Sequence, residues 1–233
     1  MSEALDKVRG VRFLPLFPLP VVLFPGVPVP LHIFEPRYRQ MLADIGAHDN
    51  LFGLSFFNAG ESERGIPPIG HPGCVAEVTE TQSLPDGRSN ILTLGLIRYH
   101  VEAYVERGEP YLVGEVSFFE DEEEDAGLLA RRVEETSAVF MRIARAVRII
   151  NDDRASLPEL PHAEPERLSF LIAAAMELDN EVKLELLELT SAAERLARLR
   201  ELLNRAVDNY EERARMHRVA GGNGHGGKKI DLE

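Results

Sequence analysis

The pattern of apolar and polar positions changes character about halfway along the chain. In the first half, apolar residues occur in short runs, as at 51–57, or in alternation with polar ones, as at 74–82. Both patterns are typical of short strands when Gly and Pro clusters separate them. We therefore predict a small sheet or barrel whose further strands lie at 91–96, 99–105 and 111–119. Pro85-Asp86-Gly87 is predicted to form a turn, because Pro fixes φ, Asp tolerates turn geometry and Gly supplies a positive φ. A short helix is expected at 35–46, with Pro36 in its first turn.

Apolar residues in the second half recur at spacings of three and four, which is the periodicity of one helical face. The stripes run through 129–150, 168–178, 182–188 and 196–210. Packing in an intrachain helical bundle explains them more simply than an intermolecular coiled coil. The predicted class is thus α+β, with a compact β domain over 11–120, a helical bundle over 126–217 and a disordered tail over 218–233.

The opening segment, residues 13–38, is apolar enough to suggest a membrane span or a signal peptide. It contains seven prolines, and each removes a backbone donor and interrupts a helix. Neither a spanning helix nor the helical core of a signal peptide tolerates that density. The segment is therefore predicted to lie extended, in strands and turns. The chain has a single cysteine, Cys74, so it cannot form an intrachain disulfide. The lack of a signal peptide and of a disulfide together predict a cytoplasmic protein.

Charge makes one class of partner less plausible. The formal net charge is −13, and residues 120–125 alone carry six acidic side chains. We interpret that run as a solvated loop between the two halves. Binding to a phosphate backbone depends on clustered Lys and Arg, so nucleic acid is disfavoured as the main partner.

Several motifs resemble the N-terminal, substrate-binding domain of Lon proteases. Leu14-Pro15-Leu16, Val22 and Phe24-Pro25-Gly26 match its opening pattern. The blocks at 73–78, 84–87, 95–99, 110–111, 183–188 and 194–196 follow in family order. The resemblance implies a PUA-like pseudo-barrel with a helical extension that recognises unfolded or tagged polypeptides. It also implies a free-standing form, because the chain has no room for the family's ATPase and peptidase.

Residues with catalytic or metal-binding chemistry are sparse. His71 and Cys74 have a spacing that two metal ligands could use, but a zinc site needs three or four. Glu61 and Glu63 form a loop carboxylate pair that we interpret as solubilising. The glycine-rich segment 222–228 fits part of a phosphate-binding loop, but Lys229 stands where Ser or Thr is required. We expect no catalytic residue, no metal and no cofactor.

Arg98 occupies the arginine position of the family's Gly-x-x-Arg segment, which begins at Gly95. One interpretation is that it binds a peptide carboxylate. The other, which we favour, is that it pairs with an acidic side chain between the two halves, because a guanidinium fork fixes geometry well.

The predicted function is a non-enzymatic polypeptide-binding module, such as an adaptor for proteolysis or quality control working with an ATP-dependent protease. Client binding would use exposed apolar surface or an unpaired strand edge. A homodimer through the helical half or a strand edge is also compatible with the sequence. The alternatives are an RNA-binding PUA-like module, which would need Arg37, Arg39, Arg64, Arg88, Arg98 and Arg107 on one face, and a small hydrolase. The candidate polypeptide-binding residues are Phe17, Phe24, Phe34 and Tyr38 of the opening, together with Phe56 and Phe57. For most residues of the opening, packing in the core is the alternative that we favour.

Overall fold

The computed structural model describes residues 2–58, 66–153 and 163–222, and the chain divides into two compact units. Unit 1 contains Met1–Glu123 and Glu166–Ser191, and unit 2 contains Glu124–Pro165 and Ala192–Glu233. The helical stretch 166–191, predicted as part of the helical bundle over 126–217, packs with the strands instead. The periodicity identified these helices but carried no information about which surface they cover.

The proline-rich opening is extended, as predicted. It forms β1 (Phe13–Leu19) and β2 (Pro28–Ile33) after a short unpredicted helix, α1 (Glu3–Lys7). Helix α2 (Pro36–Gly46) follows and has Pro36 in its first turn. The remaining strands are β3 (Leu51–Phe56), β4 (Pro72–Ser83), β5 (Ser89–Tyr104) and β6 (Leu112–Phe119).

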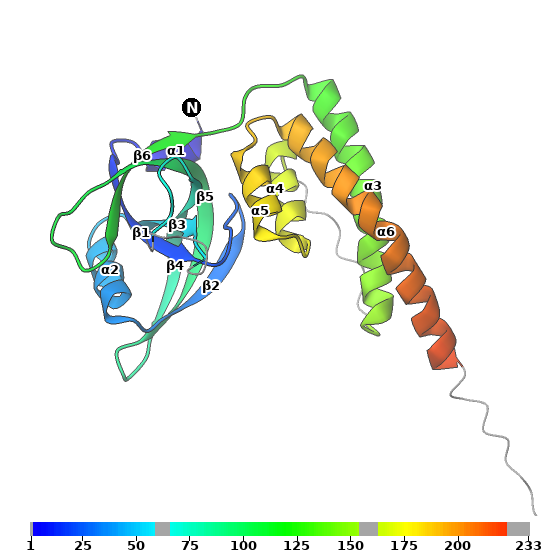
Figure 1. Cartoon of the computed structure of the whole chain (residues 1–233), viewed down its shortest axis with the longest axis horizontal. Helices are drawn as coiled ribbons and strands as arrows, with labels where there is room; N and C mark the ends of the chain where they lie inside the picture. Colours follow the sequence, from blue (N-terminus) through cyan, green and yellow to red (C-terminus); the bar gives the residue numbers. More distant parts are fainter. Residues whose placement is uncertain (1, 59–65, 154–162, 223–233) are drawn as a thin grey trace, which may run out of the picture. The chain divides into compact units, whose positions relative to one another are not determined.

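Five of the strands close into a barrel, which Figure 1 shows beside α2. The sheet order is β2-β5-β4-β3-β1-β6, and an additional β5–β6 pairing closes the ring from β5 to β6. Among the described strands, β1 and β3 pair in parallel and the other ladders are antiparallel. Strand β2 stays outside the ring and pairs with the first half of β5.

Strand β5 is one continuous strand where the sequence pattern predicted two. Its first half pairs with β2 and its second half pairs with β6, while β4 follows it along most of its length. Register shifts occur in β4 at Cys74/Ala76 and Val78/Glu80, and in β5 at Val101/Ala103. Such bulges bend and twist a strand, which lets a single strand serve both ladders of a closing barrel.

Two hydrophobic clusters among the described residues of unit 1 use opposite faces of β1. Leu14 and Leu16 join the cluster that contains Tyr99 and Val101, whereas Phe17 joins the cluster beneath α2. The alternation of side chains along a strand accounts for this division.

The free edge of β2 is poorly suited to capturing another strand. Pro28 and Pro30 lie within it and have no backbone N–H to donate. Prolines on an edge strand are a common protection against edge-to-edge pairing. The predictions of client capture or dimerisation by strand addition therefore receive no support at this edge.

Helices α4 (Pro165–Ala175) and α5 (Asn180–Glu188) belong almost wholly to unit 1. Unit 2 is built on α3 (Ala126–Ile150) and α6 (Ala192–Gly222), which run parallel side by side (Figure 1). Thr136 Oγ1 donates to the Leu196 carbonyl oxygen at 3.0 Å. Helix α6 extends into the predicted tail, of which residues 223–233 lie outside the described part. No helix within 2–58, 66–153 and 163–222 is long and apolar enough to cross a membrane.

The acidic run 120–125 is more structured than predicted. Asp125 caps α3, where its carboxylate accepts from the Leu128 N–H at 2.8 Å. Glu122 accepts from the Thr190 hydroxyl at 3.0 Å, and Glu124 accepts from the Ala193 N–H at 3.0 Å. The run is a loop, as predicted, but it is not merely solvated, because helix termini and side-chain donors use several of its carboxylates.

Candidate functional site

Four of the six predicted binding residues are buried. Phe17 of β1 and Tyr38 of α2 pack against each other with their ring centroids 3.9 Å apart, and both are less than 7% exposed. Phe24 is 1% exposed and stacks on Phe170 of α4, and Phe56 is 9% exposed. The predicted binding surface is therefore corrected at these four positions, because the rings of segment 13–38 and that of Phe56 at the end of β3 are part of the core.

Phe34 and Phe57 are the two predicted residues with accessible side chains. Phe34 is 57% exposed at the junction between β2 and α2, and its ring stacks on His32 at a centroid distance of 6.0 Å. Phe57 is half-buried at the end of β3, where its N–H donates to the Leu19 carbonyl oxygen at 2.8 Å. The predicted surface is thus reduced to these two rings, and Phe34 is the more exposed.

A groove of about 620 Å³ lies between α2 and the β4–β5 hairpin, and we call it the α2–hairpin groove. The segment from Ile33 to Pro36 adjoins it, because Pro36 lines the groove and Ile33 is the register partner of Ser89, which also lines it. Phe34 belongs to this segment. The lining residues are Pro36, Arg39, Gln40, Leu42, Ala43, Thr81, Ser83, Gly87 and Ser89.

The turn at the tip of the hairpin positions one wall of the groove. Gly87 has φ +78°, and its N–H donates to the Leu84 carbonyl oxygen at 3.0 Å, as the predicted Pro-Asp-Gly turn requires. The absence of a side chain at Gly87 has a second consequence. A Cβ there would overlap the Arg39 guanidinium, so glycine both makes the turn and leaves space for Arg39.

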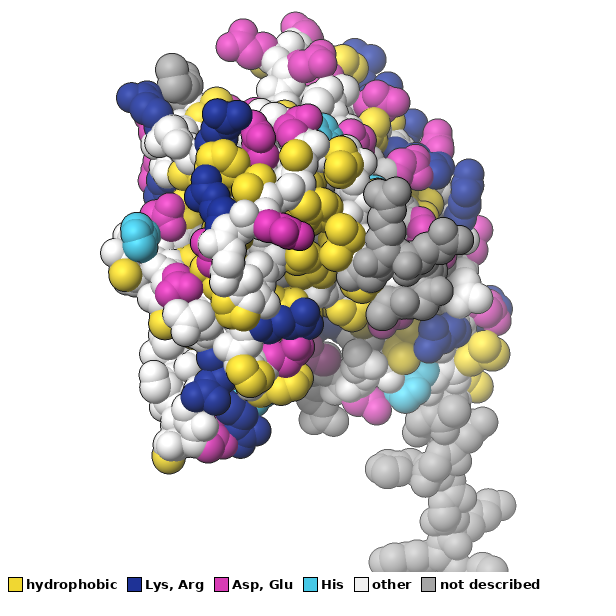
Figure 2. All heavy atoms as spheres, turned by 60° about the vertical axis from the view of Figure 1, so that its left-hand side comes forward, with side chains coloured by type: hydrophobic (Ala, Val, Ile, Leu, Met, Phe, Trp, Pro, Cys, Tyr) yellow, Lys and Arg dark blue, Asp and Glu magenta, His cyan; other side chains and the backbone are white. Residues whose placement is uncertain are grey.

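Arg39 makes no ion pair with any residue in the described ranges, whereas its neighbouring arginines are paired. Arg37 contacts Glu35 at 2.9 Å, and Arg88 contacts Asp86 at 2.6 Å. The hydrogen bonds from Arg88 lower the pKa of the Asp86 carboxyl. Figure 2 shows Lys and Arg side chains gathered at the lower left of the face it presents.

Polar side chains of the hairpin complete the groove. Ser83 and Ser89 are register partners across β4 and β5, and Thr81 lies two residues along the same strand face. None of the three hydroxyls hydrogen-bonds to another residue among those the structure describes, although Ser89 is only 9% exposed. The groove therefore offers a guanidinium and three hydroxyl donors without a carboxylate among its lining residues.

A second groove, of about 440 Å³, lies between the start of β1, the end of α2 and the β5–β6 connection. Its floor is apolar, and the Arg107 guanidinium lies 3.8 Å from the centroid of the Phe13 ring. Tyr111 donates from its hydroxyl to the Asp44 carboxylate at 2.9 Å. With Asp44, Asp49 and Glu109 in its lining, this groove has the opposite charge character to the first.

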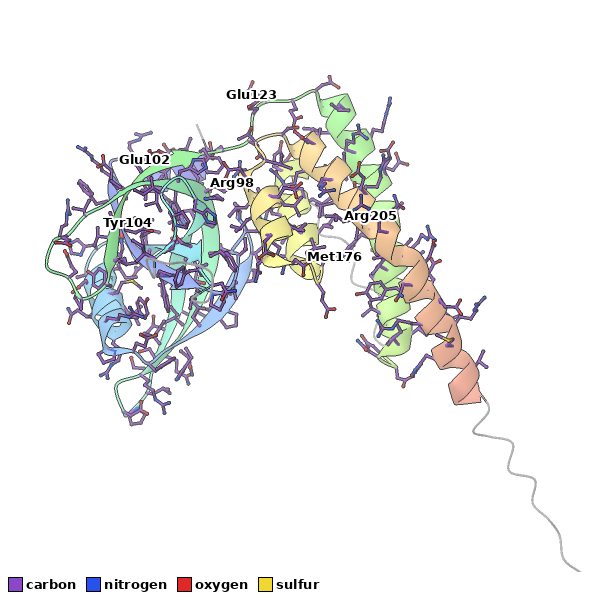
Figure 3. All side chains as sticks on the ribbon, viewed as in Figure 1. Arg98, Glu102, Tyr104, Glu123, Met176 and Arg205 are labelled. Atoms are coloured by element: carbon purple, nitrogen blue, oxygen red, sulfur yellow. The ribbon has the colours of Figure 1, made fainter. Side chains whose placement is uncertain are left out.

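Arg98 is buried, with 2% of its side chain exposed, and it pairs with Asp121 at 2.6 Å. Its guanidinium also donates to the carbonyl oxygens of Leu187 and Leu189 at 2.9 and 2.6 Å. The interpretation that Arg98 pairs with an acidic partner is therefore confirmed. The same arginine ties β5 to the end of α5 (Figure 3).

Arg98 lies at the centre of a stack of rings, which we call the Arg98 column. The guanidinium lies 4.5 Å from the centroid of Phe119 and 5.3 Å from that of Phe170. The stack continues to His100 on one side and to Phe24 on the other. Cation–π contacts gain strength when they are desolvated, so the column stabilises the packing of α4 and α5 on the barrel.

Gly95, the first residue of the Gly-x-x-Arg segment, serves the same packing. A Cβ there would overlap the carbonyl oxygen of Phe24, and the Gly95 N–H donates to the Val27 carbonyl oxygen at 3.0 Å. Because Gly95 has no side chain, the backbone segment that leads from Phe24 into β2 can pack directly against it.

The residues considered for chemistry lie apart. Cys74 is fully buried, and burial raises the pKa of its thiol to about 12, which keeps it protonated and unreactive. Burial lowers the pKa of His71. No group of three or more His, Cys, Asp and Glu in the described ranges is arranged to hold a metal. Glu61, Glu63 and segment 223–229 lie outside those ranges.

Sequence reasoning found Phe34 and the hairpin turn but missed the groove. Thr81 fell within the half-buried strand predicted at 74–82, Ser83 lay just beyond it, and Arg39 entered only in a list of basic residues. The sequence signal closest to the groove was the turn at 84–87. This turn predicts a hairpin tip, but the tip lies near α2 only because the barrel closes.

The fold and the grooves define a closed-barrel binding domain with a helical extension. A family model, the ATP-dependent protease La (LON) substrate-binding domain, matches residues 13–205. The chain belongs to this family.

Similar proteins agree with that assignment. The chain is 26% identical to Lon protease 1 of Hydrogenovibrio crunogenus over 84% of its length, and 26% identical to Lon protease 2 of Herpetosiphon aurantiacus over 90%. It spans about a quarter of the length of these relatives.

Solved structures show the same fold. A Lon N-terminal domain protein from Xanthomonas campestris matches with a TM-score of 0.58 and 26% identity, covering 81% of this chain and 97% of that one. The N-terminal domain of a Mycobacterium avium complex Lon protease matches with a TM-score of 0.61 and 18% identity, covering 82% and 98%. The predicted α+β class is confirmed.

Proposed function

We propose that this chain is a non-enzymatic module that binds unfolded or tagged polypeptides in the cytoplasm, and that it presents them to an ATP-dependent protease. The observation that carries the proposal is the α2–hairpin groove with the exposed Phe34 on its adjoining segment, in a domain of the substrate-binding family. Phe34 supplies an apolar anchor and the groove supplies hydrogen-bond donors.

Weak affinity is expected from this surface. One exposed ring buries little apolar area, at about 25 cal/mol per Å², and ordering an unfolded client opposes the gain. Weak, reversible binding suits a module that must release its client to a protease. The adaptor role rests on the family assignment together with this surface.

The test measures binding of an unfolded client. Fluorescein-labelled, carboxymethylated α-lactalbumin serves as the permanently unfolded probe, and the native, disulfide-intact protein serves as its control. Fluorescence anisotropy should rise with the unfolded probe only. The variant Phe34→Ser should weaken this binding severalfold without changing the melting temperature.

The matched control is Ile69→Ser, because Ile69 is exposed to a similar degree, at 60%, and does not line the α2–hairpin groove. It should bind the unfolded probe as the wild type does. Equal loss of binding in both variants, or no binding by the wild type, would contradict the proposal.

A further inference from the structure

The charge of the α2–hairpin groove is unusual for this chain. The protein carries 39 acidic against 26 basic side chains, yet no Asp or Glu lines the groove. Its one charged lining residue, Arg39, has no ion-pair partner in the described ranges. A cationic groove on an acidic protein points to an anionic ligand, because the remaining surface repels the same ligand.

We propose that the α2–hairpin groove binds a carboxylate of the client polypeptide, with Arg39 as the charged donor. This proposal rests on the proposed function and names the feature of the client that the groove selects. A guanidinium presents two parallel N–H donors that match the two oxygens of a carboxylate. The hydroxyls of Ser83 and Ser89, which lack partners in the described ranges, provide further donors on the facing hairpin.

The neighbouring arginines favour a carboxylate over a nucleic-acid backbone. Arg37 and Arg88 are held by Glu35 and Asp86, which leaves a single guanidinium for the ligand. Binding to a phosphate backbone gains affinity from many cationic contacts along its length. A groove with one unpaired arginine suits a single anionic group better than a chain of them.

The second groove provides the contrast within the same unit. Asp44, Asp49 and Glu109 line it beside Arg107, so it disfavours an anion. A carboxylate-bearing client is therefore directed to the α2–hairpin groove. The chain terminus and acidic side chains both supply this group, and the experiment separates these two sources.

The experiment uses a fluorescein-labelled decapeptide of alternating Leu and Ser in three forms. The first has a free carboxyl terminus, the second has a terminal amide, and the third has a terminal amide with one central Ser replaced by Glu. Anisotropy titrations with the full chain should give a dissociation constant about fivefold lower for the first or third form than for the amide, which is the scale of one exposed charge pair.

Three variants locate the effect. Arg39→Gln should bind all three peptides as weakly as the wild type binds the amide, and Arg39→Lys should restore part of the preference. Arg37→Gln removes the same charge from the same helix without touching the groove lining, so it should keep the preference. If only the first peptide binds more tightly than the amide, the groove recognises the carboxyl terminus. If the third peptide binds more tightly than the amide, the groove recognises acidic side chains.

Each remaining outcome counts against the proposal. Equal binding of all three peptides overturns the carboxylate inference and leaves the proposed function standing. If no peptide and no unfolded protein binds, both fail. A single-stranded oligonucleotide that binds more tightly than the peptides, and is weakened by Arg39→Gln, would replace the carboxylate with a nucleic-acid phosphate.

Discussion

Arg98 and Arg39 both belong to unit 1, but the surroundings of their guanidinium groups differ. Arg98 is 2% exposed and has Asp121, two carbonyl oxygens and two aromatic rings around its guanidinium. Arg39 lies exposed on α2 above Gly87 and has no ion pair among the described residues. A buried arginine whose guanidinium is paired and hydrogen-bonded, such as Arg98, is part of the scaffold. An exposed arginine without an ion-pair partner among the described residues, such as Arg39, has N–H donors available to a ligand.

The largest expected effect is on the Arg98 column. Arg98→Met should lower the free energy of unfolding by about 3–5 kcal/mol, because Asp121 is left buried without its partner. Urea unfolding followed by tyrosine fluorescence measures it, since four of the five tyrosines lie in unit 1. The double variant Arg98→Met, Asp121→Leu should recover part of the loss.

Arg39→Gln is the matching control and should change the same free energy by less than about 0.5 kcal/mol. Equal stability losses at Arg98 and Arg39 would remove the distinction between the scaffold arginine and the available one.

A smaller effect is expected at the hairpin tip. Gly87→Ala places a Cβ at φ +78° and should cost about 1–2 kcal/mol of stability. It should also weaken the carboxylate preference, because the new Cβ displaces the Arg39 guanidinium. Peptide titrations and urea unfolding of the same variant give both quantities.

Gly108 offers a close control for this substitution. It has φ +89°, and nothing lies within 4 Å of a Cβ built there. Gly108→Ala should therefore show the same loss of stability with an unchanged carboxylate preference. A lost preference in both variants would mean that backbone strain, and not Arg39, controls binding.

The far end of the column should be more tolerant. Phe24→Leu removes the ring that stacks on Phe170 but leaves an apolar side chain, and we expect a loss of about 1 kcal/mol. Phe34→Leu makes the same change at an exposed ring and should leave stability unchanged. The urea unfolding midpoints of the two variants compare a buried with an exposed phenylalanine directly. Similar losses of stability in both variants would contradict the assignment of Phe34 to the surface.

Local patterns predicted the elements of this fold better than their packing. The Pro-Asp-Gly turn, Pro36 at the start of α2 and the extended opening all depend on backbone chemistry within a few residues. The continuous β5 was missed, because a strand that changes neighbours at bulges looks like two strands when only apolar runs are considered.

The candidate site was the least predictable part. Phe17 and Phe34 have the same side chain, and only the closed barrel with α2 against it determines that the first is covered and the second is exposed. Arg39 and Ser89 lie far apart in the sequence and meet only across the α2–hairpin groove. No sequence spacing predicts that these two residues line the same groove, because their proximity depends on barrel closure and not on the helical or strand period.

The smallest expected effect comes from freeing a second arginine beside Arg39. Asp86 holds Arg88, and the hydrogen bonds between them lower the pKa of the Asp86 carboxyl. A carboxyl with a lowered pKa stabilises the folded state above its unfolded pKa, and this contribution is lost as the pH falls through the folded pKa. Any stability difference between the wild type and Asp86→Asn should therefore shrink as the pH is lowered below about 4.

At neutral pH, Asp86→Asn should strengthen binding of the carboxylate-bearing peptide about twofold, because Arg88 becomes available next to Arg39. Glu109→Gln removes the same charge from the second groove and should leave binding unchanged. Peptide anisotropy at two salt concentrations separates the two cases, since a local pair and a general change in net charge respond differently to screening. Equal gains for the carboxylate and amide peptides would show that Arg88 contributes without recognising the anion.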